Sequence, residues 1–428
     1  MLELDNLRAA GLGRADLALY DHPGEHLRDE LYRVWLAVEA QLRRRWERGA
    51  LRRDLARPGQ ATADEIDAVL AEVHADYGNR DPSAPGLDAR DARKHLLRRA
   101  AQVDARAEAT LAAGRRLPLH EIASRLGLDP DQRRLLAACA APLLDPRLLP
   151  LLRLLTGDPA ADGLTRSVAL TLAAAEPIGR ARLAAHLAAG SPLVDLRLVG
   201  TSARGELIPS ARLLALLSGA AGIDPELTGW AELRPRAAPG QFPAGLVARA
   251  AAALGARAPL CVLVGGAAGA GKLLLVEEAA ASLGRRVLAA DTGALTGRDD
   301  EARTDALARL ARDALLARAV LAVRHADAGT ASALLSRVRA PIAIISPPPA
   351  QRWPAPTVPI AVPELDPGAR AAVWQREAPE LDDEAAAGLA RLYNTTASAI
   401  ARVVAAVRAM GPLDLERLVA EIEARLSR

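Results

Sequence analysis

The feature that most constrains the fold is an alternation of short apolar runs and amphipathic segments in the second half of the chain. The apolar runs predict five strands, at 260–264, 286–290, 319–323, 342–346 and 358–362. Helical patterns at about 272–283, 300–317 and 329–338 separate the first four strands. Strands that alternate with helices form a parallel sheet covered on both faces. We therefore predict a five-stranded parallel α/β domain.

The remainder of the chain is predicted to be helix-rich. Half of the 428 residues are hydrophobic but only 2% are aromatic, which favours packed helices over β-sandwiches or barrels. Helical patterns cover residues 15–57, 63–76 and 88–113. In chain order we expect a helical N-terminal region (1–115), a winged-helix-like domain (116–234), a linker (235–244), the α/β domain (245–366) and a small helical lid (367–428).

The winged-helix-like domain is predicted from short helices that end in a hairpin. Clear stop signals delimit helices at 119–126, 131–142, 146–155, 163–175 and 178–188. Two apolar stretches, 193–199 and 206–209, then flank a turn that contains glycine. This pattern is typical of a β-hairpin, and helices followed by a hairpin suggest a winged helix.

Composition and charge argue against several classes of protein. The formal net charge is only +3, so no concentrated basic footprint favours nucleic-acid binding. Cys139 and Cys261 lie in apolar runs and make no disulfide framework, which is consistent with a reducing compartment. We find neither a signal peptide nor an apolar run long enough to span a membrane, and the histidines have no metal-ligand spacing. A cytoplasmic protein without a membrane segment or a metal site is expected.

The strongest chemical signal follows the first predicted strand and opens a helix. Its residues are Gly266, Ala267, Ala268, Gly269, Ala270, Gly271, Lys272 and Leu273, which fit G-x-x-x-x-G-K of a phosphate-binding loop. Small residues let backbone N–H groups converge on a phosphate, and the helix N-terminus adds partial positive charge. Only two of the 55 basic residues are lysine, so a lysine at this position is unlikely to arise by chance. Its compact ammonium fits inside such a loop where a guanidinium would not.

Three positions that normally handle magnesium are altered. Leu273 stands where a serine or threonine hydroxyl would ligate Mg²⁺. The third strand should end in two acidic residues but ends in Arg324 and His325, and Asp327 lies too far along the chain to replace them. A metal-free pocket with Arg324 near the usual cation position is one interpretation, and an exposed Arg324 on a decayed site is the other. In both, hydrolysis is expected to be impaired.

The order of strands, phosphate-binding loop, degenerate acidic strand and helical lid resembles an AAA+ ATPase module. By this resemblance Ser346, after the fourth strand, takes the place of a polar sensor. Residues 393–400 resemble the second sensor region, with Arg402 as a candidate arginine, and Arg352 and Arg370 are candidate arginine fingers. The resemblance implies ATP or ADP as the ligand, with doubtful dependence on magnesium.

Upstream, residues 117–130, the Leu135-Leu136 helix and residues 142–146 resemble the winged-helix domain that precedes AAA+ modules in one bacterial group. Those proteins are often associated with contractile injection systems, and they commonly pair a degenerate first AAA+ module with an active second one. The chain resembles their N-terminal half. The resemblance implies a homo- or hetero-oligomer with AAA+ subunits, in which this chain acts as a nucleotide-binding assembly or adaptor module.

Two other functions remain open from the sequence. The chain could be a working ATPase that remodels protein assemblies, with the missing groups supplied by a neighbouring subunit. It could also be a winged-helix DNA-binding regulator, because residues 120–128 resemble the first half of a helix-turn-helix. The helix that follows, 131–140, is apolar after its first turn, whereas a recognition helix presents polar side chains to the groove. Nucleic-acid binding is therefore the least favoured of the three.

Overall fold

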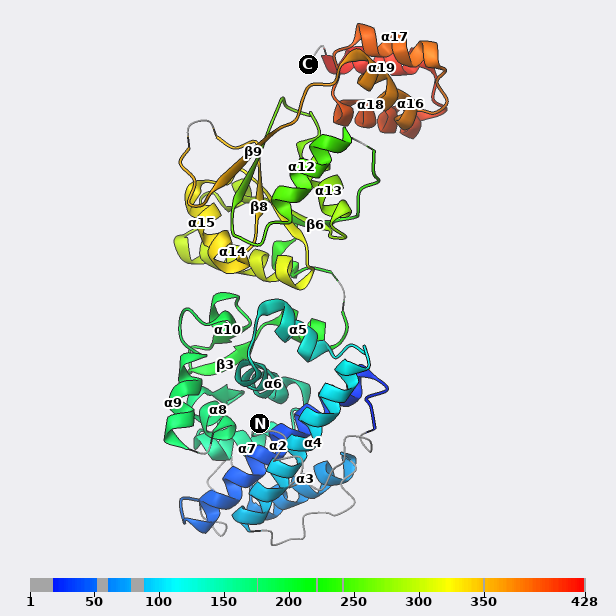
Figure 1. The fold of residues 1–428 in the computed structure, drawn as a ribbon. Helices are drawn as coiled ribbons and strands as arrows, with labels where there is room; N and C mark the ends of the chain where they lie inside the picture. The colour runs from blue at the N-terminus through cyan, green and yellow to red at the C-terminus, as the bar shows by residue number, and fades with distance from the viewer. Residues whose placement is uncertain are drawn as a thin grey trace. The chain divides into compact units, whose positions relative to one another are not determined.

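The computed structural model describes residues 18–51, 61–77, 88–174, 176–220, 222–240, 242–348 and 351–426. The chain forms two compact units, Met1–Gly222 and Ile223–Arg428 (Figure 1). Residues 223–234, which the sequence analysis grouped with the winged-helix-like domain, thus belong to the second unit.

The first unit begins with three helices, α2 (Pro23–Glu47), α3 (Ala63–Asp76) and α4 (Ala89–Ala112). The side chains of Thr62 and Asp88 cap the N-termini of α3 and α4, which explains why both helices begin where the sequence predicted. Helix α2 is shorter than the predicted 15–57, of which 15–17 and 52–57 lie outside the described residues. Helices α2 and α4 pack along each other.

The remaining helices of the first unit surround a small antiparallel sheet. They are α5 (Pro118–Leu126), α6 (Pro130–Leu144), α7 (Leu148–Thr156), α8 (Arg166–Ala173), α9 (Pro177–Ala185), α10 (Pro192–Asp195) and α11 (Ala211–Leu217). The strands β1 (Leu164–Thr165), β2 (Val199–Thr201) and β3 (Glu206–Pro209) pair in the order β1-β3-β2. The predicted hairpin is present, but a strand over 193–199 is wrong. Ser191 caps a helical turn that starts at Pro192, so the strand begins only at Val199.

The second unit contains a six-stranded, mostly parallel sheet. Its strands are β4 (Ala231–Arg234), β5 (Cys261–Gly265), β6 (Val287–Asp291), β7 (Val320–Arg324), β8 (Ile342–Ile345) and β9 (Thr357–Ala361), in the order β4-β6-β7-β8-β5-β9. The five predicted strands run parallel to one another. The expected five-stranded sheet is nevertheless wrong by one strand, because β4 pairs antiparallel with β6.

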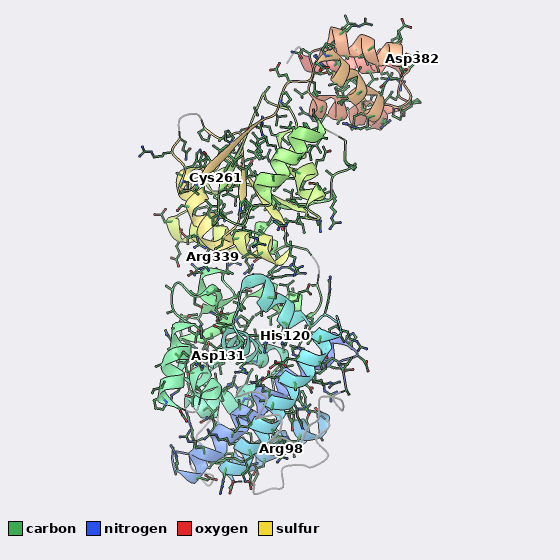
Figure 2. All side chains as sticks on the ribbon, in the orientation of Figure 1. Arg98, His120, Asp131, Cys261, Arg339 and Asp382 are labelled. Carbon is green, nitrogen blue, oxygen red and sulfur yellow. The ribbon has the colours of Figure 1, made fainter. Side chains whose placement is uncertain are left out.

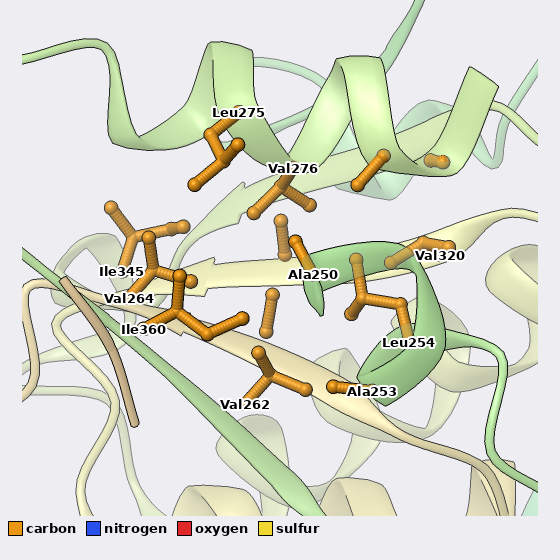
Figure 3. Close-up of a cluster of buried hydrophobic side chains, with 14 of the residues drawn as sticks. Ala250, Ala253, Leu254, Val262, Val264, Leu275, Val276, Val320, Ile345 and Ile360 are labelled. Atoms are coloured by element: carbon orange, nitrogen blue, oxygen red, sulfur yellow. The ribbon is translucent and has the colours of Figure 1, made fainter. Parts of the chain in front are cut away.

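Helices cover both faces of this sheet. On one face α12 (Ala244–Leu254) and α13 (Lys272–Ser282) pack on Val262, Val264 and Ile345 (Figure 3). Side chains at the alternate positions of the strands, such as Leu321 and Val323, are also buried. Because successive strand side chains point to opposite faces, these belong to a second layer, where α14 (Asp300–Leu316) and α15 (Ala328–Val338) pack together. The short 3-10 helices η2 (Pro225–Leu227) and η3 (Thr292–Leu295) complete this domain.

The C-terminal segment has a hydrophobic core of its own. It consists of α16 (Pro367–Glu377), α17 (Asp383–Leu392), α18 (Ala397–Met410) and α19 (Leu415–Leu426). Trp374 is fully buried at its centre, against residues such as Val403 and Leu418. The helical character predicted for 367–428 is confirmed for these four elements, and the action of the bundle as a lid stays a prediction.

Two further expectations concern redox state and membranes. Cys139 and Cys261 are both buried as free thiols. Among the described helices, none is by itself both long and apolar enough to cross a bilayer. Helices α6 and α7 together meet the length and composition criteria, but they bend by 116° where they join.

The core of the first unit contains histidines that are buried without charge. His26 is completely inaccessible, and its ring lies 4.9 Å from that of His120, which is labelled in Figure 2. Burial, together with the nearby His120 and Arg133, lowers the pKa of His26 to about 3. Burial and Arg133 also lower the pKa of His120 to about 4. Both rings are therefore neutral in the folded protein at neutral pH.

We predict that this burial makes the first unit sensitive to mild acid. Between pH 6.5 and 3 the unfolded chain binds a proton at His26 that the folded chain does not, so stability falls as the pH falls through this window. At pH 5.5 the loss from His26 alone is about 1.4 kcal/mol relative to pH 7.5. Hydrogen exchange of the α2 amides at the two pH values measures it. His26→Gln should remove this part of the pH dependence, and an unchanged dependence in the variant would contradict the assignment.

Candidate functional site

The candidate site is the loop that connects β5 to α13, at the carboxyl edge of the parallel strands. Strand β5 lies between β8 and β9, and the chain leaves it to form β6 on the far side of β7. Ligands of open α/β sheets bind beside the carboxyl ends of strands at such reversals of strand order. The sequence-predicted loop, residues 266–273, therefore lies where this fold favours a binding site.

The loop takes a backbone conformation that only glycine adopts readily. Gly266, Gly269 and Gly271 have φ angles of +139°, +76° and +84°. A Cβ atom on Gly266 would lie 2.8 Å from the carbonyl oxygen of Val362. One on Gly271 would lie 3.0 Å from the ring of Phe242. The glycines thus serve both the positive φ angles and the close approach of neighbouring segments.

Lys272 is folded back over the loop. Its side chain is largely buried, and the ammonium donates hydrogen bonds to the carbonyl oxygens of Gly266 (3.0 Å) and Ala267 (2.6 Å). These bonds fix the ammonium beside the loop backbone. An ammonium has three N–H donors, and these two hydrogen bonds use two of them. The third makes no hydrogen bond among the described residues.

The N-terminus of α13 has no side-chain cap. The first backbone N–H that bonds within the helix is that of Leu275, to the carbonyl of Gly271. The preceding amides lie at the positive end of the helix dipole, where an anion is stabilised. By contrast, Asp299 and Asp327 cap α14 and α15. Leu273 packs partly against the hydrophobic core, so its position offers no metal ligand.

The altered acidic positions form a charge cluster with a residue that the sequence analysis missed. Asp291 ends β6 and is paired in register with Arg324 at the end of β7. It accepts a hydrogen bond from His325 Nδ1 (2.7 Å) and pairs with Arg324 Nη2 (3.5 Å). Burial raises the pKa of the Asp291 carboxyl, but His325, the Gly293 N–H and Arg324 outweigh it and hold that pKa below its ordinary value. The carboxylate is therefore ionised at neutral pH.

This cluster changes the expected electrostatics of the site. Arg324 is 56% exposed, and Asp291 balances its charge locally. The pairing favours the interpretation in which Arg324 turns toward solvent over the one in which it replaces a cation. The sequence does show an acidic residue, Asp291, directly after the second predicted strand. Its role at the site becomes evident only because β6 pairs with β7.

Two residues at this edge have left-handed backbones. His325 and Ser346, which follow β7 and β8, have φ angles of +56° and +55°. Non-glycine residues in this region carry strain that tends to gather at functional sites. The N–H of Ser346 donates to the carbonyl of Val264 (2.9 Å), which ties it to the strand that leads into the loop. The predicted sensor position is thus next to β5.

The arginines proposed from the resemblance lie in different surroundings. Arg370 is buried, and its guanidinium donates to the Tyr393 and Leu365 carbonyls and the Asn394 side chain. These bonds hold the C-terminal helices together, so Arg370 is a poor candidate for a finger. Arg352 and Arg402 are exposed and stay untested candidates.

Asp327, near the site, has a structural role. Asp327, which the sequence analysis did not substitute for the missing acids, caps α15 by accepting from the Thr330 N–H and pairs with Arg303. Burial acts to raise its pKa, but these partners lower it to about 2. Among the described residues, no group of three His, Cys, Asp or Glu side chains is arranged to hold a metal ion.

The helix proposed as a DNA-recognition element is part of the core. Residues 135–142 of α6 are all buried, and this helix packs against α2, α8 and β3. It cannot enter a groove without unfolding the unit. Helix α9 is far more exposed, with Leu183 as its only buried residue. Its Ile178 is 84% exposed, and its Arg182 pairs with Asp131 of α6.

The geometry defines a protein with a winged-helix unit followed by a mostly parallel α/β domain that carries a glycine-rich loop. The comparison with protein families agrees for the first unit. Residues 10–224 match the family described as winged helix domain, variant, which is half of the chain, and the chain belongs to that family. The match begins well upstream of residue 116, where the sequence analysis placed the start of this domain. No curated protein matches the chain.

The loop geometry predicts contrasting effects at two adjacent glycines. Gly266→Ala should destabilise the second unit by about 1–3 kcal/mol, because φ is positive and the new Cβ would collide with the Val362 carbonyl. Gly265→Ala is the control, since its Cβ would meet nothing within 4 Å. Urea unfolding measures both. Equal stability of the two variants would contradict the assigned loop conformation.

Proposed function

We propose that the second unit is a nucleotide-binding module of the AAA+ type, which holds the phosphates of ATP or ADP in the loop 266–273. One observation carries the proposal: a buried Lys272 ammonium is hydrogen-bonded to the loop beside an uncapped helix N-terminus. Converging amides, a helix dipole and a single ammonium are the groups that cradle a polyphosphate. The winged-helix family and the mostly parallel sheet are compatible with this proposal.

The same site lacks the groups that accelerate hydrolysis. Phosphoryl transfer depends on a metal that bridges the phosphates and on a group that orients water. Leu273 cannot ligate a metal, and Arg324 replaces the first acidic residue. The second is His325, whose Nδ1 bonds to Asp291. We therefore propose that nucleotide binds without needing magnesium and that turnover by the chain alone is very slow.

A module of this kind acts by holding a nucleotide rather than by consuming it. Following the AAA+ resemblance, we propose that the chain assembles with itself or with active AAA+ subunits and serves as an adaptor, in a setting such as a contractile injection system. In this proposal the helices α16–α19 act as the lid, and the first unit provides the surface for assembly.

We predict that binding depends on one of the two lysines. In calorimetry, Lys272→Ala should weaken binding of ATP and ADP at least tenfold, because a charge-assisted contact to phosphate is worth about 1.5–3 kcal/mol. Lys94→Ala, at an exposed ion pair with Asp91 in the first unit, is the matched control and should bind as the unaltered protein does. Replacing magnesium with a chelator should change the affinity less than threefold.

Three results would count against this proposal. No heat of binding for either nucleotide would remove the nucleotide-binding function. A strict requirement for magnesium would contradict the metal-free site. Phosphate release far above the Lys272→Ala background would favour the alternative, an active ATPase.

We further predict that magnesium dependence can be restored. The triple variant Leu273→Ser, Arg324→Asp and His325→Glu returns the hydroxyl and both carboxylates to their usual positions. Binding should then tighten on addition of magnesium, which calorimetry measures. The variant Leu273→Ser alone is the control and should stay insensitive. A triple variant that binds nucleotide but ignores magnesium would show that the loop does not present the phosphates toward β7.

A further inference from the structure

The first unit contains a cavity that the nucleotide-binding proposal does not use. Its volume is about 730 Å³, within the range of small-molecule sites. Helices α2, α4, α6 and α8 line it, and Arg98, labelled in Figure 2, lies on its α4 side. Alanines form much of its wall: Ala37, Ala100, Ala101, Ala105, Ala137, Ala138 and Ala173. Their short side chains leave apolar space among the helices.

One part of the wall is strongly charged. Asp104 lines the cavity and is held by two guanidiniums, from Arg33 (3.1 Å) and Arg134 (3.2 Å). Arg133 approaches the same carboxylate to 3.7 Å. Three positive charges thus surround one carboxylate. Glu30, which lies 3.7 Å from Arg33, and Glu108 are the other acidic residues on the wall.

The hydrogen bonding of this cluster is incomplete. Glu30 is 2% exposed, and its Oε1 lies 3.6 Å from His26 Nε2, too far for a hydrogen bond, so neither atom makes one among the described residues. Arg134 Nε, Arg133 Nε and His26 Nδ1 are likewise buried without a hydrogen bond in that part of the chain. Buried polar groups are nearly always satisfied, and two of these residues, Glu30 and Arg134, lie on the cavity wall, where an occupant can pair with them.

The charges define the kind of occupant. Burial raises the pKa of Glu30, which favours its neutral form, a hydrogen-bond donor. The buried histidines are neutral near pH 7. The arginines around Asp104 then leave an excess of positive charge at one end of an apolar cavity. An anionic head with an apolar body complements both features.

We propose that this cavity binds a small amphipathic carboxylate, whose head accepts hydrogen bonds from Arg33, Arg134 and Glu30 and whose hydrocarbon chain lies against the alanines. The site is independent of the loop 266–273, because all of its residues belong to the first unit.

Calorimetry with the full chain tests the proposal, with decanoate as the ligand. Decanol has a similar chain without charge, and decyltrimethylammonium has a positive head. Decanoate should bind saturably with one site per chain and at least tenfold more tightly than either comparison compound. Equal binding of decanoate and decanol, tighter binding of the cation, or no saturable binding of decanoate would overturn the proposal. The last result would mean that water fills the cavity.

Variants locate the binding. Arg134→Gln should weaken decanoate binding at least tenfold, while Glu30→Gln, which keeps a donor and removes the acid, should bind equally or more tightly. Arg153→Gln is the matched control, because Arg153 pairs with Asp162 outside the cavity, and its affinity should stay within twofold. Weaker binding in Glu30→Gln, or unchanged binding in Arg134→Gln, would contradict the assigned head-group site.

A cavity-filling variant supports the test if Arg134→Gln proves unstable. Ala101 lines the cavity and is only partly buried, so Ala101→Leu should occupy the space with little strain. Thermal melting confirms that the variant is folded. Decanoate affinity should then fall at least tenfold, and unchanged affinity in the folded variant would place the ligand elsewhere.

Discussion

The second unit depends on a steric constraint in the loop after β5. Gly266 passes so close to the Val362 carbonyl, just beyond β9, that no side chain fits between them. The position of β9 beside β5 therefore fixes the start of the loop, while Lys272 closes its other end through two carbonyls. These contacts hold the loop to the sheet. In the binding proposed for this loop, amides held in this way would lose less entropy when a ligand is bound.

The sequence predicted the parallel strands well because each contains an apolar run. Strands β5 to β8 have buried side chains on both faces, and the edge strand β9 buries only Ile360. Strand β4 escaped prediction because it is short, polar and only partly buried, and because it pairs antiparallel at the edge of the sheet. The loop residues were recognised from their spacing. Asp291 was not, because its role follows from the neighbouring position of β6 and β7, which no local pattern reveals. The cavity of the first unit is equally non-local, since four helices contribute to it.

The altered acidic positions are better described as a rearranged charge cluster than as a simple loss. Without a carboxylate partner, Arg324 would add a second positive charge to the sheet edge that also carries Lys272, and like charges repel. Asp291 offsets that charge from the adjacent strand. In the nucleotide site that we propose, a charge-balanced edge gives phosphate no extra attraction there, so Lys272 and the helix N-terminus would supply most of it.

The first segment of the second unit is fastened to α14 and to α13, the helix that begins at the loop. Asp224 is bound by Arg312 of α14, and Arg234 pairs with Glu277 of α13 (2.9 Å). Farther along, the Gly240 N–H donates to Glu278 (2.5 Å), and Phe242 lies against Gly271. Residues 224–240 and Phe242 are thus anchored at several points, the last of which is the loop itself. Because Phe242 occupies the space beside Gly271, a shift of the loop must either carry this segment with it or break these contacts.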